Sequence, residues 1–299
     1  MALEATGMIS AELDPVAPSR GRGHQFARLI RQNPLGFFGL IVVLALGISA
    51  FFAPFIAPYE PKQIGAGAIG ADPSAGHLFG TDELGRDMFS RVVYGSRISL
   101  TVGFLAVAFG TLVGTAIGIF SGYVGGSIDN FIQRTVDTAI AFPALLLLLI
   151  LRQVMGPSLR TLVIAVGIAI IPGVARVVRG AVLSERNNQY VEAARALGAS
   201  TLRILFRHIA PNVVALSIII MTTLIGTAIL AEAALSFLGL GIPSSVTWGQ
   251  DVSNARNTFP IHVWQAFFPG AAITLTVLGF NLLGDSLRDI FDPRLRGRL

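Results

Sequence analysis

The residues best suited to chemistry in this 299-residue chain are three carboxylates, Asp82, Glu83 and Asp87, that fall within six positions. Such a group can ligate a hard cation or serve as acid and base. Arg86 lies among them and Gly85 promotes a turn, which favours a self-paired loop on the outer surface instead. The four histidines are scattered and lack metal-ligand spacing. We therefore predict no catalytic residue and no metal site, and we do not expect an enzyme.

The composition excludes several other classes of protein. The only lysine, Lys62, follows no glycine-rich turn, so the chain lacks the phosphate-binding loop of P-loop ATPases. Cysteine is absent, which excludes disulfides, thiolate zinc sites and cysteine nucleophiles. The net charge of +5 gives no bulk basic patch for nucleic acid. With 53% hydrophobic and 13% charged residues and a mean hydropathy of +0.69, the sequence indicates a membrane protein.

The elements that must position these residues are long apolar runs. A helix needs about twenty mostly apolar residues to cross roughly 30 Å of hydrocarbon. The runs are too continuous for the alternating strands of a barrel, so we predict an all-α polytopic membrane protein. Six transmembrane helices are expected, at residues 35–55, 98–122, 131–151, 161–178, 213–238 and 263–284.

The basic residues predict the orientation of these helices. With the N-terminus inside, fifteen of the 22 Lys and Arg residues fall on the cytoplasmic side, so both termini are expected in the cytoplasm. Residues 1–24 lack the basic start and apolar run of a signal peptide. The predicted segments are a cytoplasmic tail (1–34), the first transmembrane helix (35–57), an outside segment (58–97), a core of five transmembrane helices (98–285) containing a cytoplasmic loop (180–212), and a cytoplasmic C-terminal tail (286–299).

The second predicted span carries a ridge of glycines at i+4 spacing. Such residues lie on nearly one face of a helix and let another helix approach closely. That helix belongs either to the same chain or to a second subunit, and the sequence leaves both alternatives open. The ridge consists of Gly110, Gly114, Gly118 and Gly122.

Three ionisable residues lie close to the predicted hydrocarbon, where charge is costly and is usually paired or functional. Arg134 and Asp137 are three positions apart on one helix face, which favours a local ion pair. Glu232 has no partner in its own span and can pair with another helix or face a substrate path. Pro143 and Pro172 lie inside predicted spans and should kink them.

The loop at 180–212 is too polar to span and is patterned as two short helices. The first is expected at 188–197, and Gly198 ends it because glycine tolerates the left-handed backbone. The second is expected at 201–209, and Pro211 should break the chain before the fifth span. The loop either forms a compact knob in the cytoplasm or an interfacial amphipathic anchor. The expected apolar faces comprise Val191, Ala194, Leu197, Leu202, Leu205, Phe206 and Ile209.

The run Glu192-Ala193-Ala194, with Gly198 and Pro211 after it, resembles the EAA loop in permease subunits of bacterial ATP-binding-cassette (ABC) importers. In that family this coupling loop docks in a groove of the ATPase subunit. The chain has His208 and Ala210 where the family usually shows Ile and Leu ahead of the proline. The resemblance implies that ATPase docking involves Tyr190, Glu192, Ala193, Ala194, Arg195, Gly198, Ala199, Arg203 and Pro211.

Four further segments, 80–87, 94–100, 234–241 and 284–294, are similar to the C-type permeases for dipeptides, oligopeptides and nickel. The resemblance implies a type I importer permease in the bacterial inner membrane, paired with a homologous permease as a heterodimer. It further implies two ATPase subunits that carry ATP and Mg, a binding protein outside, and no cofactor on this chain. An ion-driven secondary transporter that uses Glu232 is the alternative.

Overall fold

The structure is a computed structural model that describes residues 33–291. The chain forms a compact unit from Leu35 onward. These residues form helices joined by loops, and no strand occurs among them beyond one isolated bridge between Thr81 and Asp87. Five helices are long and apolar enough to cross a membrane. They are α2 (Pro34–Phe51), α4 (Met88–Val124), α7 (Leu159–Arg186), the run Thr201–Phe237 that contains α10 (Ala210–Phe237), and α12 (Trp264–Phe291).

The two predicted tails fall mainly outside this description. Of the N-terminal tail at 1–34, only residues 33 and 34 are described, and the latter begins α2. Of the C-terminal tail at 286–299, residues up to Phe291 continue α12 as helix, and the others lie outside the described residues.

The predicted third span is two helices, α5 (Gly126–Ala141) and α6 (Ala144–Met155), bent by 92°. Pro143 explains the break, because proline has no backbone N–H and forces the preceding residue out of the helical region. Phe142 is accordingly extended, with φ −78° and ψ 131°. Pro172 lies inside α7 without ending it. Six spans are therefore obtained when the bent pair is counted as one.

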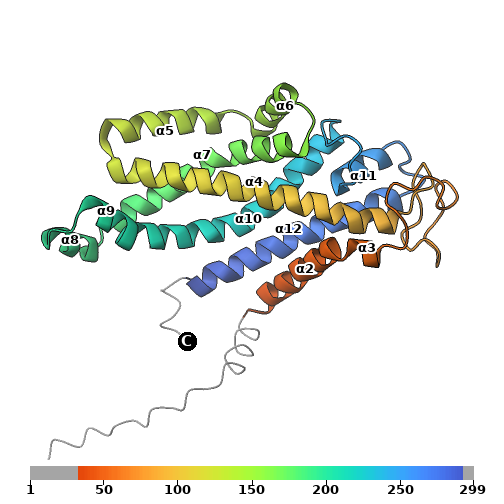
Figure 1. Cartoon of the computed structure of the whole chain (residues 1–299), viewed down its shortest axis with the longest axis horizontal. Coiled ribbons are helices and arrows are strands. Elements are labelled where there is room, and N and C mark those ends of the chain that lie inside the picture. Colours follow the sequence, from red (N-terminus) through yellow and green to blue (C-terminus); the bar gives the residue numbers. More distant parts are fainter. Residues whose placement is uncertain (1–32, 292–299) are drawn as a thin grey trace, which may run out of the picture. The chain divides into compact units, whose positions relative to one another are not determined.

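The glycine ridge of α4 packs against α7 of the same chain, and Figure 1 shows these two helices side by side. A Cβ added at Gly110 would lie 2.7 Å from the carbonyl oxygen of Gly167, and one at Gly118 would lie 2.7 Å from that of Ala175. Each later glycine of α4 contacts a later residue of α7, so the two helices run parallel. The bent pair must therefore carry the chain back between them. Of the two alternatives for the ridge, the structure shows packing within the chain.

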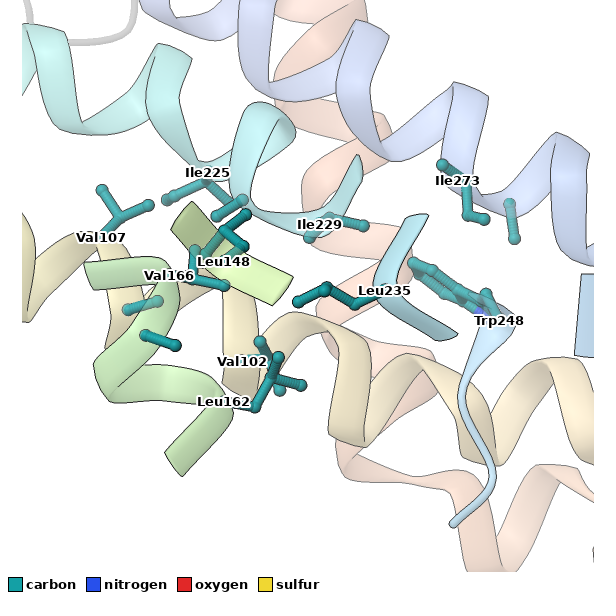
Figure 2. Packing of buried hydrophobic residues seen from close by; sticks show 14 residues of the cluster. Val102, Val107, Leu148, Leu162, Val166, Ile225, Ile229, Leu235, Trp248 and Ile273 are labelled. Atoms are coloured by element: carbon teal, nitrogen blue, oxygen red, sulfur yellow. The ribbon is translucent and has the colours of Figure 1, made fainter. Parts of the chain in front are cut away.

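Two apolar cores lie toward opposite ends of these helices. One surrounds Trp248 at the start of α11 (Trp248–Ala255), and Figure 2 shows side chains of α4, α7, α10 and α12 meeting there. The other lies under α8 (Gln189–Ala196) and joins α7 to α10. Figure 1 shows α8 and α11 at opposite ends of the long helices, and these ends are called the α8 end and the α11 end below.

Pro211 does not break the chain, contrary to the sequence prediction. The short α9 (Thr201–Ile204) runs through a π-helical turn, η1 (Leu205–Ile209), directly into α10. Pro211 sits in the first turn of α10, where a missing N–H is tolerated. The wide turn before it bonds the amide of Ala210 to the carbonyl of Leu205, five residues back, so the chain accommodates the proline by changing helical register.

Candidate docking surface

The coupling loop forms the helix–turn–helix that the sequence predicts. Asn188 is extended at the start of α8, and Leu197 ends the helix before Gly198, which has φ +78°. The amide of Ala199 donates to the carbonyl of Ala194 at 3.0 Å, which closes the turn. The Ser200 hydroxyl accepts from the amide of Arg203 and caps α9.

The inner side of the loop is a set of buried aliphatic side chains. Val191, Ile204 and Ile209 are nearly inaccessible to solvent and pack with valines of α7 and with Val213 of α10. Ile204 and Ile209 are five positions apart and share this side because the π turn adds a residue to the helical repeat. The loop is thereby fixed to two of the membrane-spanning helices.

The outer side of the loop carries an unusual row of apolar side chains. Leu197, Leu202 and Phe206 are 89%, 66% and 70% exposed. The prediction that Leu197 shares the buried face of Val191 is wrong, because Leu197 lies beyond the last turn of α8. Leu202 and Phe206 were likewise expected on one stripe with Ile209, and the change of register separates them. Exposed apolar side chains of this kind mark surfaces that a partner protein or the membrane covers.

The residues expected to dock the ATPase are all within this loop, and most of them face outward. Within the described part of the chain, the side chains of Glu192, Arg195 and Arg203 form no hydrogen bond or ion pair. Ala194 and Ala199 are half-buried against the inner aliphatic cluster. The exposed members are Tyr190, Glu192, Ala193, Arg195, Gly198, Arg203 and Pro211.

The structure shows a polar cluster between α8, α7 and α10 that the sequence does not predict. The Tyr190 hydroxyl donates to the carboxylate of Glu185, in the last turn of α7, and accepts from the side-chain amide of Asn212 at 3.1 Å. Asn188 also donates to Glu185, at 2.9 Å. Burial, and then the hydrogen bond to the Glu185 carboxylate, raise the pKa of Tyr190. Sequence spacing gives no signal for this cluster, because its members come from three helices.

The predicted ion pair between Arg134 and Asp137 does not form. Asp137 pairs instead with Arg176 of α7, because α5 packs along that helix. A second, more buried pair joins Asp129 of α5 to Arg179 of α7 at 2.6 Å, and Ser121 of α4 also donates to Asp129. These pairs fasten the first half of the bent span to its neighbours.

Glu232 lies inside the chain's own core. Its side chain is fully buried, accepts from the Ser236 hydroxyl at 2.8 Å and lies 3.5 Å from that of Ser99 on α4. Ser99 in turn accepts from the backbone amide of Trp248. Glu232 therefore joins α10, α4 and α11, and in this structure it does not line an open path.

The acidic loop at the α11 end is self-paired, as predicted. Asp82 accepts from the amides of Leu84 and Arg86 at 2.9 Å and from the Arg86 side chain at 2.5 Å. Asp87 caps α4 by accepting from the amide of Ser90 at 2.8 Å, and it also contacts His77. Among the described residues, no group of three His, Cys, Asp or Glu could hold a metal ion.

The α11 end also contains a buried ion pair that sequence spacing does not reveal. Arg91 of α4 donates to Asp251 of α11 at 2.9 Å and to the carbonyl oxygen of Pro61 at 2.9 Å. The Trp248 indole donates to the carbonyl of Val92 at 2.8 Å. The segments before α4 and after α10 are thus fastened to the same helix.

Comparison with known proteins identifies this arrangement. Residues 114–297 match the family described as binding-protein-dependent transport system inner membrane component, and residues 21–73 match the N-terminal transmembrane domain of oligopeptide transport permease C. The chain belongs to this permease family. It is 42% identical over 268 residues to the dipeptide transport system permease protein of Alkalihalophilus pseudofirmus, covering 89% of this chain and 88% of that relative.

Other relatives carry related names. The oligopeptide transport system permease protein of Bacillus subtilis is 40% identical over 267 residues, with 89% of this chain and 88% of the relative covered. The glutathione transport system permease protein of Pectobacterium atrosepticum is 42% identical over 271 residues, with 90% of each chain covered. A crystal structure of an amino acid ABC transporter shares the fold, with a TM-score of 0.53 at 20% identity over 69% of this chain and 95% of that chain.

Family membership decides between the alternatives left open by the sequence. The permease is a multi-pass inner membrane protein and a transport component rather than an enzyme. It has the type I importer permease fold and works with ATPase and binding-protein partners. The ion-driven alternative finds no support among these relatives.

Proposed function

We propose that this permease is the C-type subunit of an ATP-driven importer for dipeptides or oligopeptides. The observation that carries the proposal is the outward apolar row of Leu197, Leu202 and Phe206 on a loop packed against α7 and α10. An ATPase groove that buries such a row can move both spans. The peptide class rests on relatives named as dipeptide and oligopeptide permeases.

The importer contains four further subunits in this proposal. A homologous permease pairs with this chain as a heterodimer and encloses the path. Two ATPases, which bind ATP and Mg, dock on the coupling loops, while this chain binds no cofactor and no nucleic acid. The binding protein delivers substrate at the α11 end, over the loops around 58–87 and 239–262.

The proposed mechanism is an equilibrium between an inward-open and an outward-open state. ATP at the α8 end and the loaded binding protein at the α11 end both shift this equilibrium. ATP binding closes the ATPases and displaces the coupling loop, which moves α7 and α10 and opens the path outward. Hydrolysis resets the inward state. Each ligand shifts the equilibrium only by its difference in affinity for the two states.

The test is uptake into proteoliposomes that hold the complete importer with ATP inside. Radiolabelled alanyl-phenylalanine, trialanine, glutathione and nickel chloride are offered separately with the binding protein present. We expect ATP-dependent uptake of at least one of the first two, and no uptake when ATP is replaced by a proton gradient.

Two results would overturn the proposal in different ways. Uptake driven by a proton gradient without ATP would replace the ATP-driven mechanism. ATP-dependent uptake of glutathione or nickel alone would keep the mechanism and change the substrate class.

A further inference from the structure

Two tyrosine hydroxyls connect the coupling loop to three spans. Tyr190 of α8 donates to Glu185 of α7 and accepts from Asn212 of α10 at 3.1 Å. Tyr123, at the end of α4, donates to the carbonyl oxygen of Thr201, the first residue of α9, at 3.1 Å. Along the loop, Tyr190 lies before the Gly198 turn and the carbonyl that Tyr123 reaches lies after it, so the two hydroxyls attach the loop on both sides of the turn.

The rest of the attachment between α8 and the spans is small. Val191 is the only fully buried residue of α8, and Ala194 is half-buried against the same cluster, so this short helix is attached along one narrow aliphatic strip about which it can turn. The Tyr190 hydroxyl supplies a second kind of attachment. Together, the two attachments fix the orientation of α8 relative to the spans. The Glu185 carboxylate, which accepts the hydrogen bond from Tyr190, also accepts one from the side-chain amide of Asn188 at 2.9 Å. This second bond holds the carboxylate in place.

The second helix of the loop is attached differently. Asn212 donates to the carbonyl oxygen of His208 at 3.1 Å as well as to Tyr190, so it links the π turn to α8. Arg186 of α7 donates to the backbone carbonyl of Tyr123 at 3.2 Å, which ties the end of α4 to α7. The ring of Tyr123 packs against the inner aliphatic cluster, so its hydroxyl can be removed without creating a cavity.

We propose that Tyr190 and Tyr123 are positioning residues that hold the coupling loop at a fixed angle to α4, α7 and α10, so that nucleotide-driven displacement of the loop moves the spans. Without these hydroxyls the docked loop rotates about its aliphatic contacts, and its displacement by the ATPase no longer moves the spans. The inference rests on the proposed function, because it assumes an ATPase docked on the loop.

The test compares Tyr190→Phe, Tyr123→Phe and the double variant in the complete importer. Tyr59→Phe is the matched control, because Tyr59 also donates to a backbone carbonyl, that of Gly76, but at the α11 end. The chain has no cysteine, so two spin labels can be placed on introduced cysteines, in an importer whose other subunits lack accessible cysteines. Gln189→Cys of α8, exposed and outside the expected docking residues, and Val177→Cys of α7 report the angle of the loop. The probe is AMP-PNP with Mg, which requires no transport substrate.

We expect the wild type and Tyr59→Phe to show one narrow distance that shifts fully with nucleotide. In each of the other single variants the distance should broaden, and the ratio of molecules that shift to molecules that do not should fall about five-fold, the factor expected for loss of one hydrogen bond. Tyr123 lies outside the residues expected to dock the ATPase. In Tyr123→Phe, co-purification of the ATPase subunits and their basal ATP hydrolysis should therefore stay unchanged, which a role in docking alone would not allow. Glu185→Gln retains an acceptor and should behave as wild type, whereas Glu185→Ala should reproduce Tyr190→Phe.

A narrow, fully shifting distance in the double variant would overturn the inference. Loss of ATPase co-purification in Tyr190→Phe would also overturn it, since the hydroxyl would then be a docking contact. If the wild type itself fails to bind the ATPases, the proposed function fails instead, and the two failures are thereby distinguishable.

Discussion

Gly198 is the single position where the backbone itself sets the shape of the docking surface. Its φ of +78° lies in the left-handed region, and nothing lies within 4 Å of a Cβ added there. A side chain at this position would therefore meet no steric clash with other residues, but it would strain the backbone. The cost of the left-handed region for a residue with a Cβ is about 1–2 kcal/mol.

Gly198→Ala should loosen the turn between α8 and α9 by roughly 1 kcal/mol and weaken ATPase docking several-fold, while membrane insertion stays intact. Gly198→Asn should recover part of the loss, because asparagine tolerates the left-handed region. The measurement is the ATPase-to-permease ratio after purification. Gly180→Ala is the control, since Gly180 lies in α7 with nothing within 4 Å. Equal losses in Gly198→Ala and the control would contradict this account.

At the level of single residues, the sequence predicted what local rules govern. The Gly198 turn, the self-paired Asp82 loop and the break at Pro143 depend on neighbours in the chain. Pairs between distant residues were missed or wrong. Arg134 was expected to pair with Asp137 three positions away, and only the packing of α5 on α7 reveals Arg176 as the partner.

The contact between α4 and α7 is the most extensive helix pairing in the described chain, and it depends on four glycines. A methyl group at Gly118 would lie 2.7 Å from the carbonyl oxygen of Ala175 and 2.8 Å from Val178. Neither can retreat easily, because one is helix backbone and the other is fully buried. The helices would have to separate.

Gly118→Ala should therefore destabilise the purified permease by about 1–3 kcal/mol, which lowers its thermal unfolding midpoint by several degrees. Gly173→Ala, in α7 where nothing lies within 4 Å, should leave the midpoint within about a degree of wild type. Both substitutions raise helix propensity equally, so the difference isolates packing. An unchanged midpoint in Gly118→Ala would show that the two helices are not in contact in the membrane.

At the level of elements, apolar run length predicted the spans well, because hydrocarbon thickness imposes it. The helical register was harder to predict. Ile209 of the expected stripe is buried together with Ile204, whereas Leu202 and Phe206 are exposed, because the π turn before Pro211 shifts the faces of the second loop helix. This change of helical register depends on how α10 packs against its neighbours, so hydrophobic periodicity in the sequence does not predict it.

At the scale of the whole molecule, the Arg91–Asp251 pair joins segments 160 positions apart. Both side chains are buried, and Arg91 also holds the carbonyl of Pro61. Without Asp251, the nearest carboxylate to Arg91 is Asp82, 3.9 Å away and already bound by Arg86. Breaking a buried pair typically costs about 3–5 kcal/mol, whereas replacing both partners with apolar groups of similar volume is often neutral.

Asp251→Leu should thus lower the thermal midpoint strongly, and adding Arg91→Met should restore much of the loss. The apparent coupling between the two substitutions, read from thermal unfolding of all four variants, should exceed about 1 kcal/mol. Additive effects would mean that the two side chains do not interact in the assembled importer. Arg256→Met, at a half-exposed cation–π contact with Phe237, serves as the control for loss of a cation.

The number of membrane crossings follows from helix directions that the structure fixes. Successive glycines of α4 contact successive residues of α7, so these helices are parallel and the bent α5–α6 pair must cross between them. Gly36 meets Ser286 while Gly39 meets Gly279, so α2 and α12 are antiparallel. Six crossings place the start of α2, the end of α12 and the coupling loop on one side, and the excess of basic residues there predicts that this side is cytoplasmic.

Single cysteines in this cysteine-free chain test that arrangement directly. Ile69 and Leu197 are both highly exposed. Ile69 precedes Gly70, which lies against His262 at the α11 end, and Leu197 ends α8. A membrane-impermeant maleimide should label Ile69→Cys in spheroplasts and Leu197→Cys only in inverted vesicles from cells that express the permease without its ATPase subunits. Leu148→Cys, buried in the core, should resist labelling in both. Labelling of Ile69→Cys and Leu197→Cys from the same side would mean that the bent pair is re-entrant or that an apolar helix does not span, because the two ends could then not be separated by the bilayer.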